Sequence, residues 1–520
     1  MKSTSKNKKE DENNAYRTIQ FVVKNGHPLN KYFMDMMYKS NNLYNATNFH
    51  LRQLWTALKV EEGKTIHPLQ QEVIDLFKST IPKVNKNNTK KFEKLVKKDI
   101  FEAKVFDSKK KRKVTKFNMP TSENSFCSYE LMDAVFKTSK NVDYNSLPAH
   151  VNQGVMKQVY NDWSSFFEGF KEFKVNPSKF KGKPKPPRYK TKGATNSLVF
   201  SNQVCKVKDG KYLRFPKTKE VFNLSKHLLE KIDNNKLVQV RVQKFYDDVK
   251  LEVVLDCSKN VKELKPVEDI KNVMAIDLGV NNLATCVSNN GMQPTIINGR
   301  ALKSMNQYYN KLRAKLYSDL RISKNSKEGK FTSKRLEYID MKRHFKVKDF
   351  LHKASKQVVD LAISNKIDKV IVGYNSSWKE DIEMKKKDKQ TFVNIPFSMF
   401  LDILEYKLNA EGIHFETFEE SYTSKASFLD NDPIPTYGDK NIPKFSGRRV
   451  KRGLYISKNG ISINSDVNGA CNILKKHSNK DVEISHKILS NVRKINISNG
   501  SKKIKSTLDI LLNTKEINLA

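Results

Sequence analysis

Apolar positions follow two different spacings in the first half of the chain. Between about residues 30 and 175 they recur at helical intervals, which predicts a set of helices. Residues 16–23, and short runs between 197 and 255, alternate apolar and polar side chains as half-exposed antiparallel strands do. The segment 177–187 reads PSKFKGKPKPP, and its prolines exclude a helix or a central strand. The pattern predicts a β-barrel whose first strand is separated from the others by a helical insert.

The second half of the chain predicts a different domain. A buried strand at 273–276 is followed by a turn at Gly279 and a returning strand at 283–287. Further along come a buried strand, an amphipathic helix, an alternating strand and a last helix, at residues 367–372, 397–410, 413–420 and 463–474. A hairpin, a strand, a helix, a strand and a terminal helix in this order are typical of a ribonuclease-H-like domain. We therefore expect an α+β multidomain protein.

The charge of the chain indicates its partner. Its 520 residues include 97 Lys and Arg against 56 Asp and Glu, a formal net charge of +41. A compact chain with this charge repels itself unless a polyanion is close by, and the basic residues are spread along the whole sequence. We therefore expect nucleic acid as the partner, bound with an affinity that falls steeply with salt.

Cysteine usage and hydropathy exclude several other classes. The five cysteines form no C-x-x-C pair, so neither a disulfide framework nor a cysteine zinc site is expected. No apolar run reaches the length that crosses a bilayer, and residues 1–15 are polar and charged without the apolar core of a signal peptide. We expect a disordered N-terminus and a cytoplasmic protein.

Three carboxylates in the second half carry the candidate chemistry. Asp277 ends a buried strand, where a carboxylate is costly unless a cation or hydrogen bonds compensate it. Asp466 lies in the first turn of the last helix, and the strand 413–420 carries acids at Glu416, Glu419 and Glu420, one of which would supply the third carboxylate. Each aspartate alone also fits a plain turn or helix cap. Carboxylates from two strands and a helix can hold two divalent ions for phosphodiester hydrolysis, and hard oxygen ligands suit Mg²⁺ or Mn²⁺. No P-loop supports nucleotide hydrolysis.

These acid-bearing segments and four other motifs resemble one known family. The motifs are NLYNATNFHLRQ (42–53), NPSKFKGKPKPPRYK (176–190), GRALKSMNQYYNKLRAKL (299–316) and FSGRRVKRGLY (445–455). Together, over about residues 16–478, the chain resembles the TnpB proteins and the related small type V CRISPR effectors. The resemblance implies a Mg²⁺-dependent, RNA-guided DNA endonuclease that cuts beside a short adjacent motif. Two alternatives remain: a nuclease-inactive RNA-guided repressor, and a guide-free transposase or resolvase on the same fold.

The resemblance also implies a domain organisation. A wedge β-barrel and a helical recognition lobe would precede a RuvC nuclease domain of the ribonuclease-H-like fold. The implied ranges are 16–25 and 176–265 for the wedge barrel, 26–175 for the recognition lobe, 266–478 for the nuclease domain and 479–520 for a basic C-terminal tail. The implied partners are a guide RNA and target double-stranded DNA, without a membrane, and the chain could act as a monomer or a homodimer.

One departure concerns the third acid of the nuclease site. In most members of the family a glutamate ends the strand equivalent to 367–372, whereas this chain has Gly373. A subgroup places the glutamate on the next strand, before a Thr-Ser pair, and Glu420 in E-S-Y-T-S matches that position. Neighbouring strands lie about 4.8 Å apart, so a Glu side chain can reach the same ions. Glu419 and the more remote Glu380 are the other candidates.

The second departure is the lack of a zinc ribbon. Members of the family often carry two C-x-x-C pairs after the Thr-Ser, but the segment 422–460 contains no cysteine. We therefore expect a zinc-free, basic insert that binds the target nucleic acid. The residues expected to contact nucleic acid are Arg300, Lys303, Arg448, Arg449 and Arg452. Each of them also fits a solvated basic surface.

Overall fold

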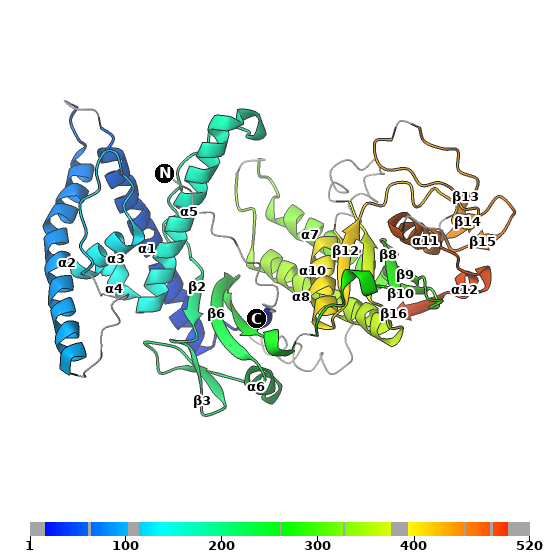
Figure 1. Cartoon of the computed structure of the whole chain (residues 1–520), viewed down its shortest axis with the longest axis horizontal. Helices are drawn as coiled ribbons and strands as arrows, with labels where there is room; N and C mark the ends of the chain where they lie inside the picture. The colour runs from blue at the N-terminus through cyan, green and yellow to red at the C-terminus, as the bar shows by residue number, and fades with distance from the viewer. Residues whose placement is uncertain are drawn as a thin grey trace. The chain divides into compact units, whose positions relative to one another are not determined.

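The protein is described here from a computed structural model. It describes residues 16–60, 64–101, 114–260, 262–325, 328–375, 394–439, 441–451, 453–478 and 482–497. The chain divides into two compact units, Met1–Lys259 and Asn260–Ala520, which are drawn in Figure 1 and taken here one at a time. The expected disordered N-terminus, Glu380, Arg452 and the end of the C-terminal tail lie outside the described residues. No helix among the described residues is long and apolar enough to span a membrane.

Helices dominate the first unit. The N-terminus of the first helix is capped by the imidazole of His27, which accepts a hydrogen bond from the Leu29 backbone N–H. Trp163 is fully buried among other aromatic rings, and its indole N–H donates to Asn48 Oδ1 at 2.9 Å. The helices are α1 (Pro28–Ala57), α2 (Pro68–Phe101), α3 (Tyr129–Thr138), α4 (Val142–Ser146), α5 (Ala149–Val175) and α6 (Lys226–Asp233).

The strands of the first unit form two antiparallel sheets. The larger has the order β1-β7-β6-β2, with strands Tyr16–Val23, Asp248–Asp256, Lys236–Phe245 and Leu198–Ser201. The smaller contains β3 (Lys206–Lys208), β4 (Tyr212–Arg214) and β5 (Val221–Asn223). β1 pairs with β7 along its whole length, so the helical insert does separate the first strand from its partners.

The larger sheet is open, because β1 and β2 are its two edges. The expectation of a closed barrel is therefore wrong for the described residues. Even the smallest partly closed barrels need about five strands, and here four strands share one sheet while three short ones form another. Alternation in the sequence identified the strands but not how they join.

The second unit has a mixed six-stranded sheet covered by helices on both faces (Figure 1). The strand order is β12-β11-β8-β9-β10-β16, in which β8–β9 and β9–β10 are antiparallel and the other pairs parallel. The strands are β8 (Val273–Leu278), β9 (Asn282–Ser288), β10 (Thr295–Asn298), β11 (Lys369–Gly373), β12 (His414–Phe418) and β16 (Arg493–Asn496). The helices are α7 (Arg300–Leu320), α8 (Lys334–Ser364), α10 (Phe397–Ala410), α11 (Ser465–Ser478) and α12 (His486–Ser490).

The alternation of side chains in β8 decides which face each residue serves. Met274 and Ile276 pack into the core with α8 and α10, whereas Ala275 packs with α11 on the other face. Asp277, two residues after Ala275, therefore also faces α11. This hairpin, strand and helix order confirms the predicted ribonuclease-H-like domain. The sequence analysis missed β16, which comes from the expected tail and pairs in parallel with β10.

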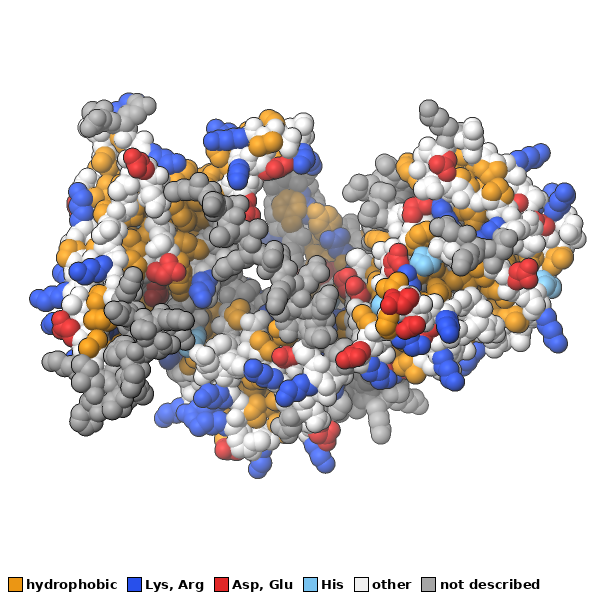
Figure 2. Space-filling model, in the orientation of Figure 1, with side chains coloured by type: hydrophobic (Ala, Val, Ile, Leu, Met, Phe, Trp, Pro, Cys, Tyr) orange, Lys and Arg blue, Asp and Glu red, His pale blue; other side chains and the backbone are white. Residues whose placement is uncertain are grey.

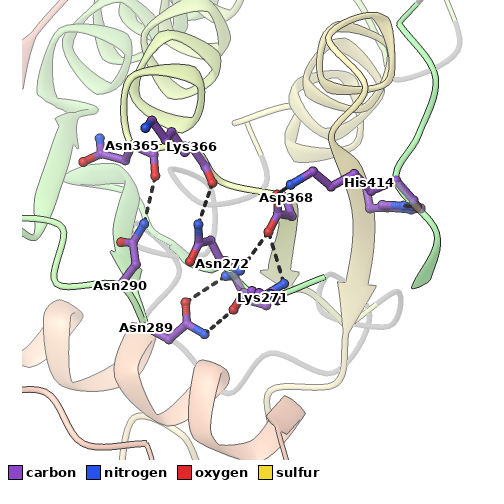
Figure 3. A network of polar contacts seen from close by, with 10 residues as sticks. Lys271, Asn272, Asn289, Asn290, Asn365, Lys366, Asp368 and His414 are labelled. Atoms are coloured by element: carbon purple, nitrogen blue, oxygen red, sulfur yellow. Dashed lines mark hydrogen bonds and ion pairs between the residues drawn. The ribbon is translucent and has the colours of Figure 1, made fainter. Parts of the chain in front are cut away.

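Polar side chains tie the N-terminal ends of β8 and β11 to the end of α8 (Figure 3). Asp368 accepts hydrogen bonds from the backbone N–H groups of Lys271 (3.1 Å) and Asn272 (3.0 Å). It also forms an ion pair with Lys265. Asn272 Nδ2 in turn donates to Lys366 O at 2.9 Å. These contacts hold the N-terminal ends of β8 and β11 together, at the end of the sheet opposite Asp277.

Between β12 and α11 the chain forms a small separate sheet. Its strands are β13 (Arg448–Lys451), β14 (Leu454–Ile456) and β15 (Ser462–Ile463). Hydrogen bonds within the insert hold it together: Asp432 accepts from the backbone N–H groups of Ser427 (2.8 Å) and Ser446 (3.0 Å). Tyr455 Oη donates to Lys425 O at 2.8 Å. Thus carboxylate and hydroxyl groups bind together a segment that has no cysteine.

Candidate nuclease site

Asp277 lies on a central strand of the sheet and faces α11. Its position is fixed by the β8–β9 ladder, where it is opposite Thr285. The helix leaves room for its carboxylate because residue 469 is glycine: a Cβ there would lie 2.8 Å from Asp277 Oδ2. A glycine within a helix costs about 0.5–1 kcal/mol relative to alanine. Here it allows the helix backbone to approach the acid.

Asp466 enters the same region from the first turn of α11. Asn464 caps this helix, since its Oδ1 accepts from the backbone N–H groups of Asp466 (3.0 Å) and Val467 (3.2 Å). The carboxylate has two further contacts: Asn282 Nδ2 donates to Oδ2 at 2.6 Å, and Arg449 Nη2 lies 3.6 Å from Oδ1. Asn464, not the aspartate, is the cap, so the Asp466 carboxylate remains available to the site.

Glu420 follows two residues after the end of β12, beside the position of the missing glutamate. Gly373 ends the neighbouring strand β11, and a Cβ added to it would clash with Glu420 Oε2. The Glu420 carboxylate thus fills the space in front of Gly373. Its Oε2 is buried and has no hydrogen-bond partner. A buried carboxylate oxygen without a partner is costly unless something absent from the protein chain compensates it.

The pKa shifts show that Asp277 interacts electrostatically with both of the other acids. Burial, and then the charge of Asp466, raise the pKa of Asp277 to about 8, although Arg449 opposes the shift. Burial, and then the charge of Asp277, raise the pKa of Glu420 well above its ordinary value. In the part of the chain that the structure describes, no three His, Cys, Asp or Glu side chains are grouped closely enough to hold a metal ion. The mutual repulsion, the orphaned oxygen and the all-oxygen donor set nevertheless fit hard divalent cations.

The other glutamates of this strand are engaged elsewhere. Glu419 forms an ion pair with Lys476, whose ammonium is nearly buried. Glu416 pairs with Lys369 Nζ at 2.6 Å and lies 3.3 Å from His477 Nε2. Of the acids at 416, 419 and 420, the structure therefore brings only Glu420 to Asp277.

The basic residues expected to contact nucleic acid have different surroundings. Arg300, the first residue of α7, and Arg448 on β13 are exposed. Lys303 Nζ donates to Asn281 Oδ1 at 3.0 Å, next to the Asn282 that contacts Asp466. Arg449 lies close to an acid of the site, with its Nη2 3.6 Å from Asp466 Oδ1. Figure 2 shows Lys and Arg side chains spread over the visible face rather than gathered in one patch.

Three residues of the site escaped the sequence analysis: Asn282, Gly469 and Lys476. Asn282 is five residues after Asp277, and a two-stranded hairpin would have placed it near the same edge. Gly469 is three residues after Asp466, so helical spacing would have put it on an adjacent face. Nothing in the sequence signals the contact of Lys476 with Glu419.

The sheet and its helices define a ribonuclease-H-like domain within a mixed α/β protein. Residues 223–379 match the family OrfB_IS605, described as a probable transposase, which includes TnpB. Residues 397–473 match the Cas12f1-like TNB domain. These two segments are thus similar to the TnpB and Cas12f1-like families.

Solved structures and curated proteins give two further comparisons. A Cas12f1–sgRNA–target DNA complex is 16% identical, with a TM-score of 0.42, over 89% of this chain and 99% of that one. C2c1 of Alicyclobacillus acidoterrestris with single-guide RNA is 10% identical, with a TM-score of 0.32, over 86% of this chain and 70% of that one. The search of curated proteins found no match.

Proposed function

We propose that this chain is an RNA-guided DNA endonuclease that hydrolyses target DNA next to a short adjacent motif. The observation that carries the proposal is the pairing of Asp277 with Glu420, whose buried Oε2 has no partner. A buried carboxylate whose pKa is raised by burial and by a second buried carboxylate marks a site that suits an additional cation. Asp466, at the start of α11, supplies the third carboxylate.

Asp277, Glu420 and Asp466 would hold two Mg²⁺ or Mn²⁺ ions. Such a pair activates water and stabilises the leaving oxygen of a phosphodiester. The chain's own groups prepare this site: Gly373 and Gly469 leave space for the carboxylates, and Asn282 orients Asp466. Arg449 lies at the rim on β13, where its guanidinium can bind a phosphate of the strand to be cut. Because Glu420 replaces the glutamate missing at 373, the chain fits the subgroup with a relocated acid.

The guide RNA and the target DNA are the proposed partners. A net charge of +41 suits a protein that holds two polyanions at once. The similarity of residues 223–379 and 397–473 to the OrfB_IS605 and Cas12f1-like TNB families supports guide-directed recognition, in which base pairing reads the sequence and the protein reads a short motif. We also propose that the chain has a wedge domain and a recognition lobe at residues 26–175. It would associate with the bacterial nucleoid.

The zinc-free nature of the insert is also proposed. The segment 422–460 has no cysteine, and Asp432 with its serine partners links parts of the segment without a metal. Arg300, Lys303, Arg448 and Arg452 would bind phosphates along the path of the nucleic acid. Metal analysis of the purified chain should find no stoichiometric zinc.

Cleavage of a linearised plasmid by the purified complex with its guide tests the function. The expected result is cutting that needs both Mg²⁺ and a matched guide, and that is lost in the Asp277→Ala and Asp466→Ala variants while DNA binding is retained. Binding without cutting by the unmodified chain would favour a nuclease-inactive repressor instead. The proposal fails in that case.

A guide-free transposase is the second candidate, because the matching family is described as a probable transposase. Purifying the chain from its native host and sequencing the RNA bound to it separates the two candidates. A discrete structured RNA supports the guide-dependent function. DNA cutting by a preparation free of RNA would establish the second candidate.

A further inference from the structure

Glu420 is not held in place by the sheet. The last bond of its strand runs from the Tyr374 backbone N–H to Phe418 O at 2.9 Å, two residues earlier. Among the described residues, the Glu420 carbonyl accepts from Thr423, through its N–H (3.2 Å) and its Oγ1 (2.8 Å). Asp277, in contrast, lies within a ladder. Because the charge of Asp277 repels the Glu420 carboxylate, a free turn would let Glu420 move outward to solvent.

A lysine on α11 holds the residues on both sides of Glu420. Lys476 Nζ forms an ion pair with the Glu419 carboxylate and donates to Ser421 O at 3.2 Å and to Pro435 O at 3.0 Å. Its side chain is only 9% exposed. An ammonium has three N–H donors, and these three acceptors satisfy all of them. A buried charge that is paired and fully hydrogen-bonded gives a defined geometry rather than a mobile contact.

We propose that Lys476 is the positioning residue for Glu420. The inference rests on the proposed function, in which Glu420 is a metal ligand. By binding the side chain of Glu419 and the carbonyl of Ser421, Lys476 turns Glu419 away and directs the side chain between them toward Asp277. At about 1.5 Å per helical residue, Lys476 starts roughly 15 Å along α11 from Asp466. It therefore acts through Glu420 and not on the substrate.

The neighbouring Lys475 provides a matched control. Lys475 also belongs to α11 and also binds the insert, through a hydrogen bond from Nζ to Asp432 O at 2.9 Å. This hydrogen bond does not involve residues 419–421. Lys475→Met and Lys476→Met thus remove the same charge from the same helix, and both release a carbonyl of the insert. Only Lys476→Met releases the residues that flank Glu420.

Binding of Mn²⁺ alone to the full-length chain without nucleic acid, followed by electron paramagnetic resonance, tests the proposal. Partners of metal ligands change metal affinity by roughly 10–100-fold, and we expect at least about tenfold weaker binding in Lys476→Met. Lys475→Met should bind like the unmodified chain, and Lys476→Arg should recover most of the affinity. Equal affinities in the two Met variants would overturn the proposal. Melting temperatures of both are measured alongside, because a purely structural role would lower stability without changing the affinity of the folded chain.

Two further variants make the result unambiguous. Glu419→Gln keeps Lys476 and weakens its anchor, so it should reduce Mn²⁺ affinity several-fold even if Lys476→Met does not fold; unchanged affinity in this variant also overturns the proposal. Glu420→Gln tests the proposed function itself. If Glu420→Gln binds Mn²⁺ normally, the assignment of Glu420 as a ligand fails. If it binds weakly while Lys476→Met binds normally, only the role of Lys476 fails.

Discussion

The carboxylate of Glu420 occupies the space that a side chain at Gly373 would fill. The strands β11 and β12 are adjacent and parallel, so either can bring an acid to the same point. On β11 the acid would be the last residue of the strand, at position 373. On β12 it comes from the turn that follows the strand, at Glu420. The absence of a side chain on one strand is the condition for the acid on the other. Position 373 and position 420 are therefore coupled, although they are 47 residues apart.

Replacing Glu420 by Gln should reduce cutting by at least about 10³-fold, because the site loses one of three charged ligands. Glu419→Gln should retain most of the cutting at saturating Mg²⁺, since Glu419 pairs with Lys476 instead of Asp277. Single-turnover cleavage of a matched target measures both. The opposite ranking would move the ligand to Glu419.

A methyl group at position 373 should also impair the site. In Gly373→Ala the new Cβ meets Glu420 Oε2 and Ile473, so the glutamate must leave its place. We expect cutting to fall at least about tenfold while guide and target binding are unchanged. Gly154→Ala is the control, because a Cβ there meets nothing within 4 Å. Full cutting by Gly373→Ala would show that Glu420 does not need this space.

Asn282 should matter for the use of metal more than for the fold. Its amide donates to Asp466 Oδ2, and Asn282→Ala frees that carboxylate to turn. The Mg²⁺ concentration for half-maximal cutting should rise by roughly 10–100-fold. Asn298→Ala removes an amide hydrogen bond to Asn496 elsewhere in the same sheet and serves as the comparison. A shared response of both variants would indicate general loosening of the sheet.

The stability of the metal-free chain should depend on pH through Asp277. Burial and the charge of Asp466 raise the pKa of Asp277 from 3.8 to about 8, so the folded state binds a proton that the unfolded chain releases at lower pH. The contribution of this group to stability is complete below about pH 4 and is lost as the pH rises toward 8. Melting temperatures in chelator from pH 5 to pH 9 should show a decline that Asp277→Asn reduces. An equal decline in both proteins would contradict this origin.

Sequence patterns were sufficient where one element decides the outcome. Alternation in 273–276 placed Asp277 at a strand end, and helical spacing placed Asp466 in the first turn of a helix. The closed barrel was wrong because alternation identifies strands without their partners. The strand at 493–496 was missed because four residues with two cations carry little β signal. Lys476 and Asn282 act through contacts across 57 and 184 residues, which no local pattern encodes.

The pairing of β1 with β7 has a consequence for synthesis. Tyr16 pairs with Asp256, so the first strand finds its neighbour only after some 240 further residues have been translated. At about 5–20 residues per second, the ribosome needs roughly ten to fifty seconds for that stretch. During this time the nascent strand has an open edge, and a chaperone that shields it would decide how much of the chain reaches the native sheet.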